Sequence, residues 1–272
     1  MSNFKNSTGY KIIENWMHQN DWQPFDFQYT TWSKYYTKHS GLVVAPTGFG
    51  KTFSVFLAVV IDYLNHPEAY KKGLKLIWVS PLRSLAKDLA KAMTNAVEDI
   101  GLDWQIEVRN GDTPTNIKRK QERLMPDVLI TTPETLHLMF SQKKNSRWFK
   151  HLNCIAVDEW HQLIGNKRGV LTELAIARLK QLSPKLQIWG ITATIGNLDE
   201  AQQVLMPYKD LKTIQIKAKL KKKIDIISVL PDQVETLPWA GHLGRTMSSK
   251  IIPIIYENTT TLIFTNTRNQ SE

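Results

Sequence analysis

The chain has 272 residues, of which 42% are hydrophobic and 22% are charged, and its formal net charge is +10. This composition excludes an intrinsically disordered or low-complexity chain and is typical of a globular protein that buries a sizeable core. The excess of basic residues fits a polyanionic partner such as nucleic acid, but it fits an ordinary soluble protein equally well.

Neither a targeting signal nor a membrane span is predicted. The N-terminal segment MSNFKNSTGYKIIENW has no basic head followed by an apolar run, so we expect a cytoplasmic protein. The longest apolar stretch, residues 53–61, reaches about half of the ~20 residues of a membrane-spanning helix, so we expect no membrane partner. Cys154 is the only cysteine, which excludes an intrachain disulfide and a cysteine-based zinc site; its apolar neighbours favour a buried thiol.

Short apolar runs alternate with amphipathic stretches along the chain and predict strands that alternate with helices. The runs are almost continuously apolar, which suits parallel strands that are covered on both faces. Residues 51–64 predict a helix that is buried all round, whereas 82–100 and 171–182 predict helices with one apolar face. The sequence therefore predicts an α/β fold with a mostly parallel sheet between two layers of helices. The predicted strands are 42–45, 75–79, 105–109, 127–131, 153–157 and 187–192.

The pattern changes after residues 198–205. Residues 213–230 form a lysine-rich alternation, and these lysines fit a solvated linker better than a nucleic-acid contact. We place the domain junction here, so residues 1–215 are expected to form one domain and 216–272 a linker and the truncated start of a second. A last strand is predicted at 261–265.

Residues 42–52 read LVVAPTGFGKT, which places a glycine-containing turn between a buried strand and a buried helix. A phosphate-binding P-loop requires this context, because backbone amides of the turn and of the helix N-terminus can surround the phosphates. Lys51 can reach the β- and γ-phosphates of ATP, and Thr52 can hold Mg²⁺. Ala45 stands where the general pattern has glycine, so the match is imperfect. The candidate ATP-binding residues of this segment are Thr47, Gly48, Phe49, Gly50, Lys51 and Thr52.

A second candidate site is NCIAVDEWH, residues 153–161, where an apolar strand ends in two adjacent acids. Asp158 is placed to hold Mg²⁺ through water, and Glu159 to orient or deprotonate the water that attacks the γ-phosphate. An isolated pair of acids could simply close a strand at the surface, but the P-loop upstream favours the catalytic interpretation. His161 is either a further catalytic residue or a surface histidine.

Seven segments, in chain order, resemble the motifs of superfamily 2 helicases. Motifs I, II and III resemble APTGFGKT, VDEWH and the TAT of residues 192–194, and alanine at the first P-loop position is usual in this superfamily. The segment SPLRSLAKDLA resembles motif Ia, and RNGDT resembles the glycine-containing motif that follows it. TTPETL resembles motif Ib, and LIFTNTRNQSE resembles motif IV.

Within the superfamily the chain is most similar to the Lhr-like (large helicase-related) group, in particular the bacterial ligase-associated DNA damage response DEXH-box helicases. The segments that carry this likeness are DEWHQLIGNKRGVLTELAIARL, WGITATIGNLDEA and LPWAGHLG. The tryptophan in the DExH box separates the chain from DEAD-box RNA helicases, whose motif II reads DEAD.

The resemblance implies a RecA-like P-loop NTPase domain with ATP and Mg²⁺ as cofactors, followed by the beginning of a second RecA-like domain. It implies that His161, Thr192 and Thr194 couple the nucleotide state to nucleic-acid contact. Gln28 lies in FDFQYTTW, where such helicases keep an adenine-reading glutamine; an exposed polar helix residue is the alternative. Trp22 and Phe25 either stack on the adenine or pack against the domain.

Nucleic-acid contacts are implied at the segments that resemble motifs Ia to Ib and motif IV. Such contacts grip the sugar-phosphate backbone and carry little sequence specificity. The basic cluster of residues 118–123 either adds to this track or forms a solvated helix face. The implied contact residues are Arg83, Gly111, Thr132, Glu134 and Arg268.

The function that the resemblance implies is an ATP-dependent helicase or translocase on DNA, or on a DNA/RNA hybrid, that moves from three prime to five prime. DNA repair is the implied process, with DNA-repair ligases or nucleases as partners. In this family a second domain supplies arginine fingers, and no motif for them precedes Glu272. We therefore expect an N-terminal fragment that binds ATP·Mg²⁺ but hydrolyses it slowly.

The alternative is a non-catalytic or partner-dependent module that binds nucleotide and nucleic acid. A transporter ATPase or a kinase is disfavoured, because the sequence has no LSGGQ-type signature and no predicted lid.

Overall fold

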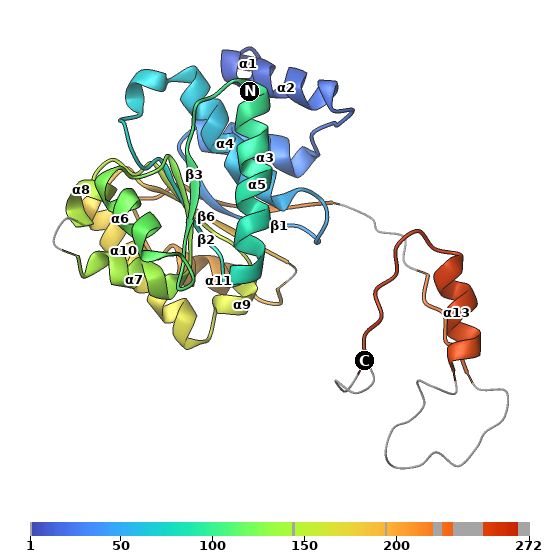
Figure 1. The fold of residues 1–272 in the computed structure, drawn as a ribbon. Coiled ribbons are helices and arrows are strands. Elements are labelled where there is room, and N and C mark those ends of the chain that lie inside the picture. Colours follow the sequence, from blue (N-terminus) through green and yellow to red (C-terminus); the bar gives the residue numbers. More distant parts are fainter. Residues whose placement is uncertain (1, 143–144, 194, 220–224, 231–246, 266–272) are drawn as a thin grey trace. The chain divides into compact units, whose positions relative to one another are not determined.

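A parallel β-sheet of seven strands forms the centre of the first part of the chain (Figure 1). The computed structural model describes residues 2–142, 145–193, 195–219, 225–230 and 247–265. The chain divides into two compact units, Met1–Leu220 and Lys221–Glu272, and the sheet lies in the first. Its strand order is β3-β4-β2-β5-β6-β1-β7, and every neighbouring pair is parallel.

The inner strands are buried along their whole length, because their side chains are apolar on both faces. The two edge strands, β3 and β7, are partly exposed. The six strands predicted between residues 42 and 192 are present, and the predicted α/β fold with a parallel sheet is confirmed. The strands are β1 Ser40–Val44, β2 Leu76–Val79, β3 Ile106–Arg109, β4 Val128–Thr131, β5 Cys154–Val157, β6 Gln187–Thr192 and β7 Thr213–Lys217.

Helices cover both faces of the sheet, and each layer has its own apolar core. Successive residues of a strand point into opposite cores: Val43 belongs to the core that includes residues of α2, α3, α4 and α5, and Leu42 to the core that includes residues of α7, α9, α10 and α11. The first layer comprises α2 Thr8–Gln19, α3 Asp26–Tyr36, α4 Lys51–Asn65 and α5 Arg83–Ile100. The second comprises α7 Pro133–Phe140, α8 Asn145–Phe149, α9 Trp160–Leu163, α10 Lys167–Leu182 and α11 Leu198–Leu205. Shorter or peripheral elements of this unit are α1 Ser2–Lys5, the 3-10 helix Pro67–Ala69 and α6 Thr115–Arg123.

Helix α4 is the buried helix that the sequence predicted. Its residues from Val55 to Ile61 are at most 1% exposed, because α2 and α3 cover the side that faces away from the sheet. In contrast, α5 buries only one face, on which Met93 and Val97 lie, and it ends at Gly101 in the left-handed conformation. Cys154 is buried, as predicted, and burial raises the pKa of its thiol.

The lysine-rich region begins inside the first unit. Residues Thr213–Lys217 form β7, which pairs with β1, and the two units meet between Leu220 and Lys221; the expected boundary after residue 215 falls within this strand. Among the described residues of the second unit, the only helix is α13, Ser248–Tyr256. The strand predicted at 261–265 is wrong: these residues are exposed and have no regular structure. An apolar run forms a strand only where a partner strand pairs with it, and the described part of this unit has none.

Across the described residues, no helix combines the length and the apolar character that crossing a membrane requires.

Candidate nucleotide and nucleic-acid site

The predicted motifs of the first unit follow strands that end at one edge of the sheet. The glycine-containing turn follows β1, the two acids follow β5, and Thr192 is the last residue of β6. The segments expected to contact nucleic acid follow β2, β3 and β4 at the same edge. In open parallel sheets, ligands bind in the crevice at the carboxyl ends of the strands.

The turn after β1 has the backbone shape of a phosphate cradle. Gly48 and Gly50 have φ angles of 87° and 69°, in the left-handed region that glycine adopts without strain. A Cβ atom at Gly50 would lie 2.9 Å from Nε2 of Gln28, so a larger residue would also clash there. Helix α4 begins at Lys51 with no side-chain cap, so its first backbone N–H groups are available to bind an anion.

The ammonium group of Lys51 lies beside Glu159 and is otherwise unpaired. Lys51 is only 8% exposed, and its Nζ is 3.6 Å from Oε1 of Glu159. This distance is too long for a hydrogen bond, and Nζ forms none with any described residue. Burying a charged donor without a hydrogen-bond acceptor is costly. A phosphate bound in the cradle would supply that acceptor, so this environment fits ATP.

Asp158 is a buried carboxylate that the fold holds by two hydrogen bonds. Its Oδ1 accepts from the backbone N–H of Glu159 (2.9 Å) and its Oδ2 from Nε1 of Trp78 on β2 (3.3 Å). Burial and the neighbouring charge of Glu159 raise the pKa of Asp158 to about 6. A divalent cation would stabilise the ionised form. Because Mg²⁺ commonly uses only one or two protein carboxylates together with phosphate and water, Asp158 with Thr52 is a fitting donor set.

The described residues contain no group of three or more His, Cys, Asp or Glu side chains that could hold a metal ion.

Glu159 connects the lysine to the histidine. Its Oε1 faces Lys51, and its Oε2 lies 3.4 Å from Nδ1 of His161. The backbone of Glu159 has φ 47° and ψ 46°, a conformation that is strained for a non-glycine residue and that is concentrated at functional sites. The chain leaves β5 at this turn, and the carboxylate of Glu159 faces Lys51 of the P-loop.

His161 joins the segment after β5 to the end of β6. Its Nδ1 lies 3.1 Å from Oγ1 of Thr192 and 3.3 Å from the backbone nitrogen of Ala193. A backbone N–H can only donate, so Nδ1 is the acceptor of the bond from Ala193, and its 3.4 Å contact with Oε2 of Glu159 is then not a hydrogen bond. The predicted coupling residues His161 and Thr192 are therefore in direct contact. Thr194 lies outside the described residues.

Gln28 is buried, at 3% exposure, and is not the exposed helix residue that was the alternative. Its Oε1 accepts from the backbone N–H of Phe25 (3.0 Å), and its Nε2 donates to the carbonyl of Gly50 (3.0 Å). The amide thus ties the start of α3 to the P-loop. One amide hydrogen and one oxygen lone pair remain for a base.

The two aromatic residues near Gln28 differ in their surroundings. Trp22 packs edge-on against Trp16, so it belongs to the domain. Phe25 contacts Phe49 of the P-loop and lines an open pocket of about 520 Å³ between the start of α3 and the end of β7. Of the two aromatic residues, only Phe25 both lines this pocket and contacts the P-loop.

The expected nucleic-acid residues Arg83 and Gly111 lie together. The guanidinium of Arg83 donates to Asp112 at 3.1 Å, and a Cβ atom at Gly111 would lie 3.1 Å from that guanidinium. Arg83 is about half exposed, so it remains available to a phosphate. Arg268 lies outside the described residues.

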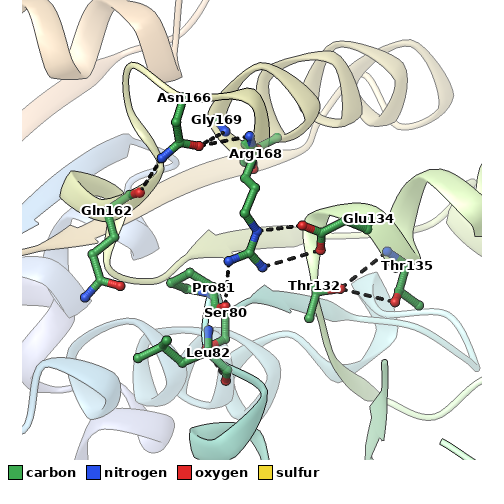
Figure 2. Close-up of polar contacts among 11 residues, drawn as sticks. Ser80, Pro81, Leu82, Thr132, Glu134, Thr135, Gln162, Asn166, Arg168 and Gly169 are labelled. Carbon is green, nitrogen blue, oxygen red and sulfur yellow. Dashed lines mark hydrogen bonds and ion pairs between the residues drawn. The ribbon is translucent and has the colours of Figure 1, made fainter. Parts of the chain in front are cut away.

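Arg168, at the start of α10, connects the segments after β2 and β4 (Figure 2). Its Nε and Nη2 donate to the two carboxylate oxygens of Glu134 (2.6 and 3.4 Å), and its Nη1 donates to the carbonyl of Pro81 (2.8 Å). Glu134 is therefore engaged by Arg168, and this ion pair lowers the pKa of Glu134 even though burial opposes the shift. Arg168 thus holds the segments that follow β2 and β4 together.

Thr132 caps helix α7. Its Oγ1 accepts from the backbone N–H of Thr135 and donates to the hydroxyl of the same residue (Figure 2). The side chain of Thr132 is buried, so a contact to nucleic acid at this position would use the backbone.

Two site residues were missed by the sequence reasoning. Trp78 looked like one more apolar strand residue, and Arg168 lay unassigned in the segment after the acids. Both depend on pairings between distant segments, namely the neighbouring positions of β2 and β5 and the packing of α10 on α7. The one local signal for Arg168 is Asn166, the residue before α10. Its side chain caps the helix, so it marks the first turn of α10, in which Arg168 lies.

Taken together, the parallel sheet, the cradle after β1 and the acids after β5 define a RecA-like P-loop nucleotide-binding domain. The sequence profile of the DEAD/DEAH box helicase family matches residues 25–204. The chain belongs to this family.

Individual relatives are of the Lhr type. The chain is 32% identical over 249 residues to ATP-dependent helicase Lhr-Core protein 2 of Thermococcus barophilus, which aligns with 85% of this chain and 29% of that protein. It is 32% identical over 244 residues to ATP-dependent helicase Lhr-Core of Methanocaldococcus jannaschii, at 85% and 28% coverage. The structure of the Mycobacterium smegmatis helicase Lhr bound to ssDNA and AMP-PNP superposes with a TM-score of 0.73 at 28% identity, covering 95% of this chain and 34% of that chain.

This chain thus spans less than a third of the length of the curated relatives that it matches, and about a third of the solved one.

Proposed function

We propose that this chain is the ATP-binding part of an ATP-dependent DNA helicase or translocase of the Lhr type. The buried ammonium of Lys51 at the start of α4 lies 3.6 Å from the carboxylate of Glu159 and donates no hydrogen bond to a described residue, and this is the observation that carries the proposal. The family match and the relative bound to ssDNA and AMP-PNP support it.

The residues of the site divide the work of phosphoryl transfer. Lys51 and the backbone N–H groups of the cradle bind the phosphates and neutralise charge on them. Asp158 and Thr52 would hold Mg²⁺, which supplies further neutralisation of the phosphate oxygens when bound. Gln28 holds the P-loop against α3 and offers its remaining donor and acceptor to adenine.

Glu159 is the group that acts on water. Its carboxylate lies between Lys51 and His161, so it can accept a proton from a water aligned with the γ-phosphate. His161 contacts Thr192 at the end of β6, so a displacement of Glu159 on phosphate release would be transmitted to the neighbouring strand end. This contact supports the coupling role proposed for His161, Thr192 and Thr194.

The track for nucleic acid lies along the strand ends at Arg83, Gly111 and the first turn of α7. Arg83 provides an exposed positive charge, which suits a phosphate. DNA as the track, a role in DNA repair and a cytoplasmic location are parts of this proposal. The ligase-associated branch and repair ligase or nuclease partners rest on the resemblance of the motifs alone.

Equilibrium binding of a fluorescent ATP analogue, with and without Mg²⁺, tests the proposal. Lys51→Ala should weaken binding at least about a hundredfold, since it removes a buried charged contact of about 3 kcal/mol. Lys11→Ala, which removes an exposed lysine of α2, is the control and should bind as the original chain does. Equal binding by both variants would refute the nucleotide site. ATP binding that is never followed by turnover in the natural protein would favour the non-catalytic module instead.

A further inference from the structure

A basic pocket lies at the edge of the sheet opposite the motifs. It has a volume of about 1110 Å³ and is formed by the segment before β2, the end of α6, the end of α7 and helix α8. The residues that precede β2, β4 and β5 contribute to it, through Leu74, Leu124 and His151. Because all strands are parallel, their amino ends lie at the edge that is farthest from the ATP cradle and from the proposed track.

The charge of this pocket is strongly one-sided. Four side chains that are positive at neutral pH line it: Lys72, Arg119, Arg123 and Arg147. All four are exposed, and none forms an ion pair with another residue that the structure describes.

The single carboxylate in the lining offsets only part of these charges. Glu122 accepts hydrogen bonds from Arg109 (2.8 Å) and Gln142 (3.2 Å), and the bond from Arg109 lowers the pKa of Glu122. Arg109 is buried beneath the pocket and is not part of its lining. The negative charge of Glu122 is thus already paired with Arg109. Among the cations of the lining, Arg119 also interacts with Glu122 and helps to lower its pKa, whereas Lys72, Arg123 and Arg147 form no ion pair with a described residue.

Arg119 and Arg123 both lie on the face of α6 that lines the pocket, and of the two only Arg123, in the last turn, is favourable for the helix dipole. They are four residues apart, so they lie on the same face of the helix, and like charges at this spacing destabilise a helix. Helix α6 also lacks an apolar face: Gln121 is its only buried residue. A helix with this composition, packed beside a deep pocket, is suited to binding an anion.

We propose that this pocket is a second binding site for a nucleic-acid strand, separate from the motor track. Arg119, Arg123, Arg147 and Lys72 would contact successive phosphates, while Leu74 and Met125 give the pocket an apolar floor for sugars or bases. Three separate elements supply the cations, so the site holds a strand over several phosphates, not a single ion. The protein would then grip nucleic acid on two sides, only one of which responds to ATP.

Fluorescence anisotropy of a labelled single-stranded oligonucleotide, measured without nucleotide over a series of salt concentrations, tests this site. The double variant Arg119→Ala/Arg123→Ala should weaken binding at least about tenfold at low salt. It should also reduce the slope of log affinity against log salt by about 1.4, because each lost phosphate contact on a single strand removes about 0.7. Arg147→Ala, on a different element, should reduce the slope by about 0.7.

The matched control is Lys11→Ala/Lys209→Ala, which removes the same charge from exposed positions outside the pocket. If the control and the pocket variant lose affinity equally, the effect is one of net charge and the site is refuted. If polyglutamate displaces the strand from the Arg83→Ala variant as well as unlabelled DNA does at equal charge, the pocket binds acidic peptide and the proposal is overturned. Binding of the ATP analogue should be the same in the pocket variant and the original chain, so a failure of the nucleotide site is detected separately.

Discussion

Replacing Asp158 by Asn should make the unliganded protein more stable. Burial and Glu159 raise the pKa of Asp158 from its ordinary 3.8 to about 6. Each pKa unit corresponds to about 1.4 kcal/mol, so ionising Asp158 in the folded state costs about 3 kcal/mol at neutral pH. Asn avoids this cost but cannot accept both hydrogen bonds, and the bond from Trp78 that is lost is worth about 1 kcal/mol. The expected net gain in the free energy of unfolding is about 2 kcal/mol.

The gain should depend on pH in a defined direction. Because the pKa is raised on folding, the protonated carboxyl stabilises the fold fully below pH 3.8, and this stabilisation is lost as the pH rises through about 6. The difference in the free energy of unfolding between Asp158→Asn and the original chain should therefore be close to zero at about pH 4.5 and reach its full value at about pH 7.

Urea denaturation without Mg²⁺ or nucleotide, followed by tryptophan fluorescence, measures this difference. Asp103→Asn, at an exposed position, is the control and should show no pH-dependent gain. A difference for Asp158→Asn that is constant across the pH range would refute the reasoning. The same variant should lose Mg²⁺-dependent binding of ATP, which would show that the unfavourable burial of this carboxylate serves the site.

Three further substitutions separate the roles of the site residues. Glu159→Gln should bind ATP within about twofold of the original yet lower turnover in the natural protein by at least about 10³-fold; unchanged turnover would remove Glu159 from water activation. Arg168→Ala should weaken binding of single-stranded DNA about tenfold and leave ATP binding unchanged. The control is Arg178→Ala on the same helix, and equal effects of the two substitutions would show that Arg168 does not shape the track. Gln28→Glu keeps the acceptor for Phe25 but places a carboxylate against the carbonyl of Gly50, so ATP affinity should fall at least about tenfold in a titration of the fluorescent analogue; full affinity would refute this contact.

Local patterns were sufficient to predict the fold. The apolar runs of β1, β2, β4, β5 and β6 mark themselves as buried parallel strands, and the apolar character of α4 on all sides predicts its position between the sheet and an outer layer. Edges were harder. The strand β7 reads as part of a lysine-rich linker, because an edge strand needs only one buried side and tolerates exposed lysines such as Lys217.

The candidate site could be predicted as a list of residues but not as an arrangement. Motif order and strand ends placed Lys51, Asp158 and Glu159 at one edge, since the carboxyl ends of parallel strands lie together. The left-handed backbone of Glu159 and the indole N–H of Trp78 that meets Asp158 have no local signature. Thr132 and Glu134 show the same limit: their motif is legible in the sequence, but the capping bond and the bridge to Arg168 depend on tertiary packing.

The burial of Cys154 has a practical consequence. The thiol is the only one in the chain, it lies within the central strand β5, and burial raises its pKa, so maleimide reagents will not reach it while the domain is folded. A single cysteine introduced at an exposed position, for example Lys209→Cys, would therefore be the one labelled site without removal of the native residue. Labelling of Cys154 itself would then report unfolding of β5. The same chain therefore offers one exposed site for a fluorophore and one buried thiol whose rate of labelling measures how often the core opens.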